Sequence, residues 1–157
     1  MAEPQTPTEG GLGQGRDEVQ LRFRDDEMAP NAQVTVDAFL DQDDATAVRI
    51  EPGDDARDLL PHLGRVRLVE INFPTFSDGR GYSAARILRE AGYDGELRAV
   101  GDVLVDQIAY MRRCGFDAFA PERPLDEADV DVALARFPEV YQPAADDAVP
   151  IWKLRHG

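Results

Sequence analysis

The chain has 157 residues, 43% of them hydrophobic, and a formal net charge of −14. Its length fits a single domain, and no apolar run approaches the ~20 residues that a membrane-spanning helix needs. Lys153 is the only lysine. Because nucleic acids and anionic membranes are bound through clustered positive charge, we expect neither as a partner. The acidity itself fits a salt-adapted or GC-rich source, with a cationic partner as the alternative.

The N-terminal residues and the single cysteine indicate the compartment. Residues 1–18 have neither the basic start nor the apolar core of a signal peptide, so we expect a disordered leader and a cytoplasmic protein. Cys114 excludes an internal disulfide and fits a reducing compartment. It precedes a predicted helix end, where the dipole disfavours a thiolate, which indicates a buried apolar role. The two histidines lie far apart in sequence, and we expect no metal and no cofactor.

Residues 19–142 are predicted to form one α/β domain. In segment 19–33, Leu21 and Phe23 alternate with charged neighbours as in a short edge strand, and residues 34–40 show some apolar periodicity. The remaining elements are predicted in this order: strand 46–50, helix 56–63, strand 67–73, helix 82–91, strand 96–100, helix 103–114, strand 116–120 and helix 126–137. Such alternation is typical of parallel strands with right-handed crossovers. We therefore predict a mostly parallel open sheet, or a partial barrel, flanked by helices.

The ends of the predicted helices carry recognisable residues. Asp102 and Asp126 stand where a side chain can accept hydrogen bonds from the first N–H groups, and Gly92 and Gly115 stand where a left-handed φ ends a helix. Residues 143–157 are predicted to be a linker and an apolar tail containing Trp152. We expect this tail to dock on the domain, or alternatively on a partner.

Polar residues follow several of the predicted strands. Asp78 and Arg80 come after the strand that ends at Phe73, and Asp102 comes after the next strand. In a parallel sheet the carboxyl ends of the strands share one edge, where ligands bind. These three side chains, with Glu122 after the following strand, are therefore predicted to lie along one edge.

The segment from Gly79 to Ala84 satisfies G-x-G-x-x-A and opens a helix, with Asp102 at a suitable distance to meet a ribose. Against a dinucleotide site, Gly79 lies six residues beyond Phe73, and Asp102 is sufficiently explained as a helix cap. A broader reading is that Gly79, Gly81 and Arg80 bind a small anion at a helix N-terminus. We favour the simpler interpretation, a turn at Asp78 and Gly79 with Arg80 in an ion pair.

Asp102 and Asp106 stand four residues apart and would share one face of a helix. Two carboxylates so placed could bind a metal or transfer protons. No nearby histidine completes a ligand set, so a cap and a dipole-compatible aspartate are the favoured interpretation. No catalytic residue is assigned, and the candidate ligand-binding residues are Asp78, Gly79, Arg80, Gly81, Asp102 and Asp106.

Three segments together resemble a bacterial family called domain of unknown function 934. They are FPTFSDGRGYSAARILR at 73–89, GELRAVGDVLVDQ at 95–107 and RCGFDAFA at 113–120. Members of that family are similar to proteins labelled as probable oxidoreductases of sulfite reduction, or as accessory proteins of sulfite reductase in sulfur assimilation. The resemblance implies no catalytic residue.

The residues qualify what the resemblance implies. Sulfite reduction needs six electrons and normally uses siroheme, iron–sulfur clusters or flavin, and one cysteine cannot ligate an iron–sulfur cluster. We therefore expect an accessory protein that acts with sulfite reductase, in sulfur assimilation and cysteine biosynthesis, without being the reductase. The alternative is a small oxidoreductase of sulfur metabolism that binds NAD(P) or an anion.

Overall fold

The computed structural model describes residues 18–29 and 33–136, so the predicted leader at 1–18, except its last residue, and the tail at 143–157 lie outside the described residues. Its core is a six-stranded open sheet, which confirms the predicted α/β class. The strands are β1 (Leu21–Arg22), β2 (Val34–Thr35), β3 (Ala47–Ile50), β4 (Leu68–Phe73), β5 (Glu96–Gly101) and β6 (Ala118–Pro121). None of the described helices is long and apolar enough to cross a membrane.

The helical elements connect these strands. They are α1 (Val36–Leu40), η1 (Ala56–Arg65), α2 (Arg80–Glu90), η2 (Val105–Gln107), α3 (Ile108–Cys114) and α4 (Glu127–Arg136). The predicted helix at 56–63 is a 3₁₀ helix that contains Pro61, which cannot donate an N–H to a regular α-helical ladder. Asp126 caps α4 by accepting from the Asp129 N–H, and Gly92 and Gly115 have positive φ, as predicted.

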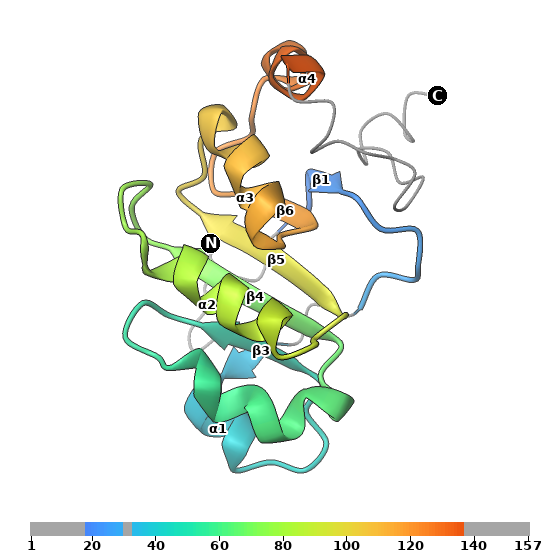
Figure 1. Ribbon diagram of the computed structural model, residues 1–157, viewed down its shortest axis with the longest axis vertical. Helices are drawn as coiled ribbons and strands as arrows, with labels where there is room; N and C mark the ends of the chain where they lie inside the picture. Colours follow the sequence, from blue (N-terminus) through green and yellow to red (C-terminus); the bar gives the residue numbers. More distant parts are fainter. Residues whose placement is uncertain (1–17, 30–32, 137–157) are drawn as a thin grey trace, which may run out of the picture.

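The strands lie in the order β1-β6-β5-β4-β3-β2. From β2 to β6 every neighbouring pair is parallel and consecutive in the chain, and only β1 is antiparallel, at the edge beside β6. Successive right-handed crossovers in one direction place their helices on one face of a sheet. Figure 1 shows α2 and α3 side by side in front of β4 and β5.

The helix-covered face of the sheet holds the main core. Val69, Ile71 and Phe73 of β4 point to this face and pack in one cluster with Ala85 and Leu88 of α2. All five side chains are buried. Alternation along β4 sends the other residues of the strand to the opposite face.

The opposite face carries a row of buried charges. Arg49 of β3, Glu70 of β4 and Arg98 of β5 are direct cross-strand partners. Arg49 Nη2 lies 2.8 Å from Glu70 Oε1, and Arg98 Nη1 lies 3.3 Å from Glu70 Oε2. Glu96 continues the row, because it accepts from both Arg98, at 2.8 Å, and Arg22, at 3.0 Å. Because the signs alternate across four strands, each buried charge meets an opposite one, as burial requires.

Candidate functional site

The loops that follow the parallel strands gather at one edge of the sheet, as the direction of β3 to β6 requires. Asp78 and Arg80 lie beyond the end of β4, and Asp102 lies beyond the end of β5. A hydrogen bond joins these two loops: the Phe76 backbone N–H donates to the Asp102 carboxylate at 2.9 Å. The edge predicted from the sequence therefore exists as a connected surface.

Asp78 and Arg80 form a local ion pair. Arg80 Nη2 lies 2.7 Å from Asp78 Oδ2, and Arg80 Nε donates to Asp78 Oδ1 at 3.1 Å. The Arg80 backbone N–H also donates to Oδ1, at 3.0 Å. The guanidinium hydrogen bond, followed by the backbone one, lowers the pKa of Asp78 to about 2. The carboxylate thus occupies the first turn of α2, where an external anion would otherwise bind. This geometry matches the favoured turn-and-ion-pair interpretation.

Gly79 and Gly81 have different surroundings. A Cβ on Gly79 would meet nothing within 4 Å, and its φ is −87°. A Cβ on Gly81 would lie 2.5 Å from Phe73 Cζ and 2.9 Å from Ile71 Cγ2. Gly81 is therefore required for the close approach of α2 to β4, and Gly79 has no such constraint.

Asp102 does not cap a helix, contrary to the prediction. Leu104 adopts an extended backbone and is the N-cap of η2, so the predicted helix at 103–114 begins later and in two parts, η2 and α3. The Asp102 carboxylate instead binds other loops, because it accepts from the Phe76 N–H and lies 3.3 Å from Arg123 Nη2 in the loop after β6. It links the loops that follow three adjacent strands.

Asp106 does not join Asp102. The extended residue between them removes the shared helix face on which the pairing prediction depended. In the described part of the chain, Asp106 has no hydrogen bond or ion pair. Within residues 18–29 and 33–136, no group of three or more His, Cys, Asp or Glu side chains could hold a metal ion. The structure thus gives these two carboxylates separate environments.

Gln107, which sequence reasoning missed, holds the loop after β4 from a second side. Its Nε2 donates to the Phe76 carbonyl at 2.8 Å and to the Tyr82 hydroxyl at 3.0 Å, while its Oε1 accepts from the Leu104 N–H at 3.0 Å. Asp102 and Gln107 therefore bind both polar backbone groups of Phe76. Phe76 is 48% exposed nonetheless. The loop presents an aromatic side chain on a fixed backbone.

Two tyrosines extend this aromatic surface across α2 and α3. The Tyr82 and Tyr110 rings lie 5.2 Å apart, and the Tyr110 side chain is 50% exposed. Arg86 Nη2 donates to the Tyr110 hydroxyl at 3.2 Å. We call Phe76, Tyr82 and Tyr110 the aromatic edge. Together with the adjacent Arg86, the aromatic edge presents aromatic and arginine side chains, which are enriched in protein–protein contacts.

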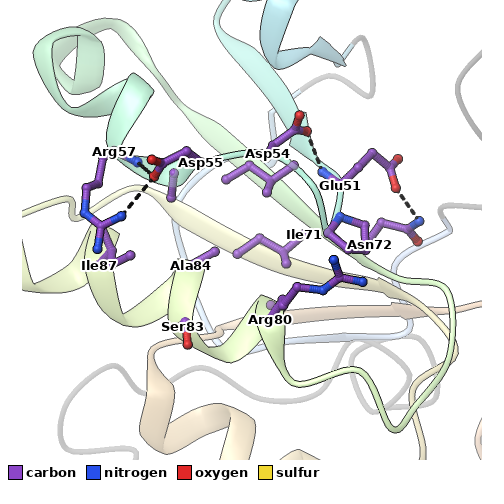
Figure 2. A pocket seen from close by; sticks show the side chains of 14 residues that line it. Glu51, Asp54, Asp55, Arg57, Ile71, Asn72, Arg80, Ser83, Ala84 and Ile87 are labelled. Atoms are coloured by element: carbon purple, nitrogen blue, oxygen red, sulfur yellow. Dashed lines mark hydrogen bonds and ion pairs between the residues drawn. The ribbon is translucent and has the colours of Figure 1, made fainter.

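A pocket of about 310 Å³ lies beside this edge, between η1 and α2 and beyond the ends of β3 and β4. Arg80 and Gly81 line it, whereas Asp78, Gly79, Asp102 and Asp106 do not. Figure 2 shows Arg80, Asn72 and Glu51 at one end and Arg57 with Asp55 at the other, with Ile71 and Ala84 between them. The structure thus brings two of the six predicted residues into one pocket.

Residues 47–152 match the model of a protein family described as "Bacterial protein of unknown function (DUF934)". The match covers more than half of the chain and includes every element from β3 to α4. No curated protein and no solved structure matches the sequence.

Proposed function

The chain belongs to the DUF934 family, and from this membership together with the aromatic edge we propose that it is an accessory protein of assimilatory sulfite reduction. In this role it binds sulfite reductase during sulfur assimilation and cysteine biosynthesis and is not itself the reductase. The proposed role places it in the cytoplasm with that enzyme. Its three family segments resemble a family whose members are similar to proteins labelled as probable oxidoreductases of sulfite reduction or as accessory proteins of sulfite reductase, and the second label supports the proposal.

The cysteine content supports a role in which sulfite reductase, and not this chain, carries out the reduction. Reduction of sulfite to sulfide takes six electrons, and iron–sulfur clusters are normally held by several cysteine thiolates. This chain has one cysteine, and the side chain of Cys114 is buried at the end of α3. The proposal therefore assigns the electron transfer to the partner.

The observation that carries the proposal is the way Phe76 is presented. Its N–H is bound by Asp102 and its carbonyl by Gln107, yet the residue is about half exposed. Ordering a loop on association costs free energy, and a loop that is already held avoids much of that cost. An aromatic ring on a fixed loop has the properties of a binding hot spot. We therefore assign the aromatic edge as the docking surface for the reductase.

The test is capture of the partner by the tagged full-length protein. We expect sulfite reductase to co-purify with the wild-type protein, and Phe76→Ala to weaken capture by about tenfold or more, the effect of removing a hot-spot side chain. Val132→Ala is the matched control, because Val132 is an equally exposed apolar residue on α4. Deletion of the gene should slow growth on sulfate and not on cysteine. The proposal fails if no sulfur-assimilation enzyme is captured and growth on sulfate is unchanged.

The second candidate is a small oxidoreductase that binds NAD(P) or an anion, and the position of Arg80 beside a pocket favours its anion-binding form. Two observations weigh against a dinucleotide. Dinucleotide-binding crevices form where the strand order of a parallel sheet reverses, and the order from β2 to β6 has no reversal. In addition, the Asp102 carboxylate is already bound to the Phe76 N–H and to Arg123. Calorimetry with NADPH, NADH, flavin nucleotides and sulfite decides this candidate, and absence of binding at millimolar concentration excludes it.

A further inference from the structure

The pocket between η1 and α2 has an apolar floor. Ile50 and Ile71 lie in the C-terminal halves of the strands β3 and β4. The two helical elements contribute Ala56 from η1 and Ala84 and Ile87 from α2. The volume of about 310 Å³ lies at the lower end of the ~300–1,000 Å³ that is typical of small-molecule sites. This size suits a metabolite of amino-acid dimensions and is small for a dinucleotide.

One end of the pocket combines opposite charges. Arg80 stands there with Asn72 and Glu51 (Figure 2). Arg80 uses its Nε and Nη2 on Asp78, which leaves Nη1 with no partner among the described residues. Glu51 Oε1 accepts a hydrogen bond from Asn72 Nδ2 at 2.7 Å, which leaves Glu51 Oε2 with no partner among the described residues. Hydrogen bonds therefore orient both side chains, and each keeps one polar atom for a ligand.

The pocket wall as a whole is not cationic. Two acids besides Glu51 line it, Asp54 and Asp55, against the two guanidinium groups of Arg57 and Arg80. Arg57 and Asp55 already pair with each other at 3.3 Å. A simple anion would meet net negative charge here, whereas a ligand that carries both charges would find a partner for each.

We propose that this pocket binds an α-amino acid with an apolar or sulfur-containing side chain. The ligand carboxylate binds Arg80, its ammonium group binds Glu51, and its side chain lies on the floor of Ile71, Ala84 and Ile87. An inorganic anion such as sulfite would leave this floor uncovered and the Oε2 atom of Glu51 without a partner. The proposal requires only the pocket and is independent of any docking to sulfite reductase.

Amide chemical-shift titration of the full-length protein tests the proposal with three matched probes. L-leucine carries both charges, 4-methylpentanoate lacks the ammonium group, and 3-methylbutylamine lacks the carboxylate. We expect L-leucine to shift the amides of Gly81 and Ser83, and each single-charge analogue to bind about tenfold more weakly, because one charge-assisted hydrogen bond is lost. L-methionine and L-cysteine, titrated in the same way, show whether a sulfur-containing side chain is preferred.

Two variants at the charged end and one control complete the design. Glu51→Gln and Arg80→Gln should each weaken L-leucine binding by about tenfold. Arg136→Gln should leave it unchanged, because Arg136 is exposed on α4 and does not line the pocket. Glu51, Arg80 and Arg136 all lie outside the apolar core, so the variants should fold.

Three results would overturn the proposal. One is that no amino acid shifts the amides of Gly81 and Ser83 at about 10 mM, a concentration that would reveal even weak sites. Another is that 4-methylpentanoate binds as tightly as L-leucine. The last is that sulfite or sulfate shifts these amides and amino acids do not, which would make the pocket a site for inorganic anions. Because no reductase enters the assay, its outcome is separate from that of the capture experiment.

Discussion

The two glycines of the G-x-G segment provide a direct test of what that segment does. A Cβ on Gly81 would overlap the Phe73 ring, and a Cβ on Gly79 would meet open space. We expect Gly81→Ala to lower the free energy of unfolding by about 1–3 kcal/mol through overpacking, and Gly79→Ala to change it by less than about 0.5 kcal/mol. Urea denaturation of both variants measures the difference. Equal effects would contradict a packing role for Gly81.

Asp102 shows which features of the site local sequence patterns can predict and which they cannot. Its place at the sheet edge follows from its position after a strand, which local patterns reveal. Its partner, the Phe76 N–H, is 26 residues away in the chain, and no local pattern encodes that bond. Gln107 was missed for the same reason, because its bond to the Phe76 carbonyl spans 31 residues. Sequence patterns thus located the edge and could not predict the contacts within it.

The loop after β4 is an element whose order depends on side chains from other loops. Asp102→Ala removes the acceptor of the Phe76 N–H. We expect this change to speed hydrogen exchange of the Phe76 amide and to cost about 0.5–1.5 kcal/mol of stability. The matched control is Asp106→Ala, since Asp106 has no hydrogen-bond or ion-pair partner in the described part of the chain. If both variants exchange the Phe76 amide at the wild-type rate, Asp102 does not hold this loop.

The elements themselves were largely predictable, because their signals are local. The strands β3 to β6 are apolar runs, and Gly92 and Gly115 end the helices before two of them. Two departures have local causes: η1 is a 3₁₀ helix around Pro61, and the extended Leu104 delays the helix after β5. The length of such an element is set by tertiary contacts and by single residues, so its boundaries were less predictable than its existence.

In the molecule as a whole, the two faces of the sheet differ in chemistry: one packs in the apolar core, and the other carries the row of buried charges. In the sequence, Arg49, Glu70 and Arg98 look like solvent-facing positions of alternating strands, and only the strand register places them opposite one another. Their burial could not be predicted from any one strand. The acidic composition gave no indication of it, because in this row arginines pair with glutamates although the chain as a whole is strongly acidic.

This row predicts a large effect for the loss of one charge. Arg98 is fully buried and binds both Glu70 and Glu96. We expect Arg98→Met to lower the free energy of unfolding by about 3–5 kcal/mol, because two buried carboxylates lose a partner. Arg136→Met, on the exposed end of α4, should change it by less than about 0.5 kcal/mol. A urea midpoint for Arg98→Met that equals that of Arg136→Met would show that the row contributes nothing to stability.

The antiparallel edge strand β1 determines the order in which the strands can pair during synthesis on the ribosome. From β2 to β6 each strand pairs with the one synthesised just before it, so the sheet can grow by one unit at a time. The exception is β1, whose Leu21 pairs with Phe119, and beside it Gln20 bonds to Leu125, 105 positions later. The first strand to be made is therefore the last to find its partner. Until β6 has emerged, β1 has no neighbouring strand to pair with, and the Phe23 ring lacks its edge-to-face contact with Phe119.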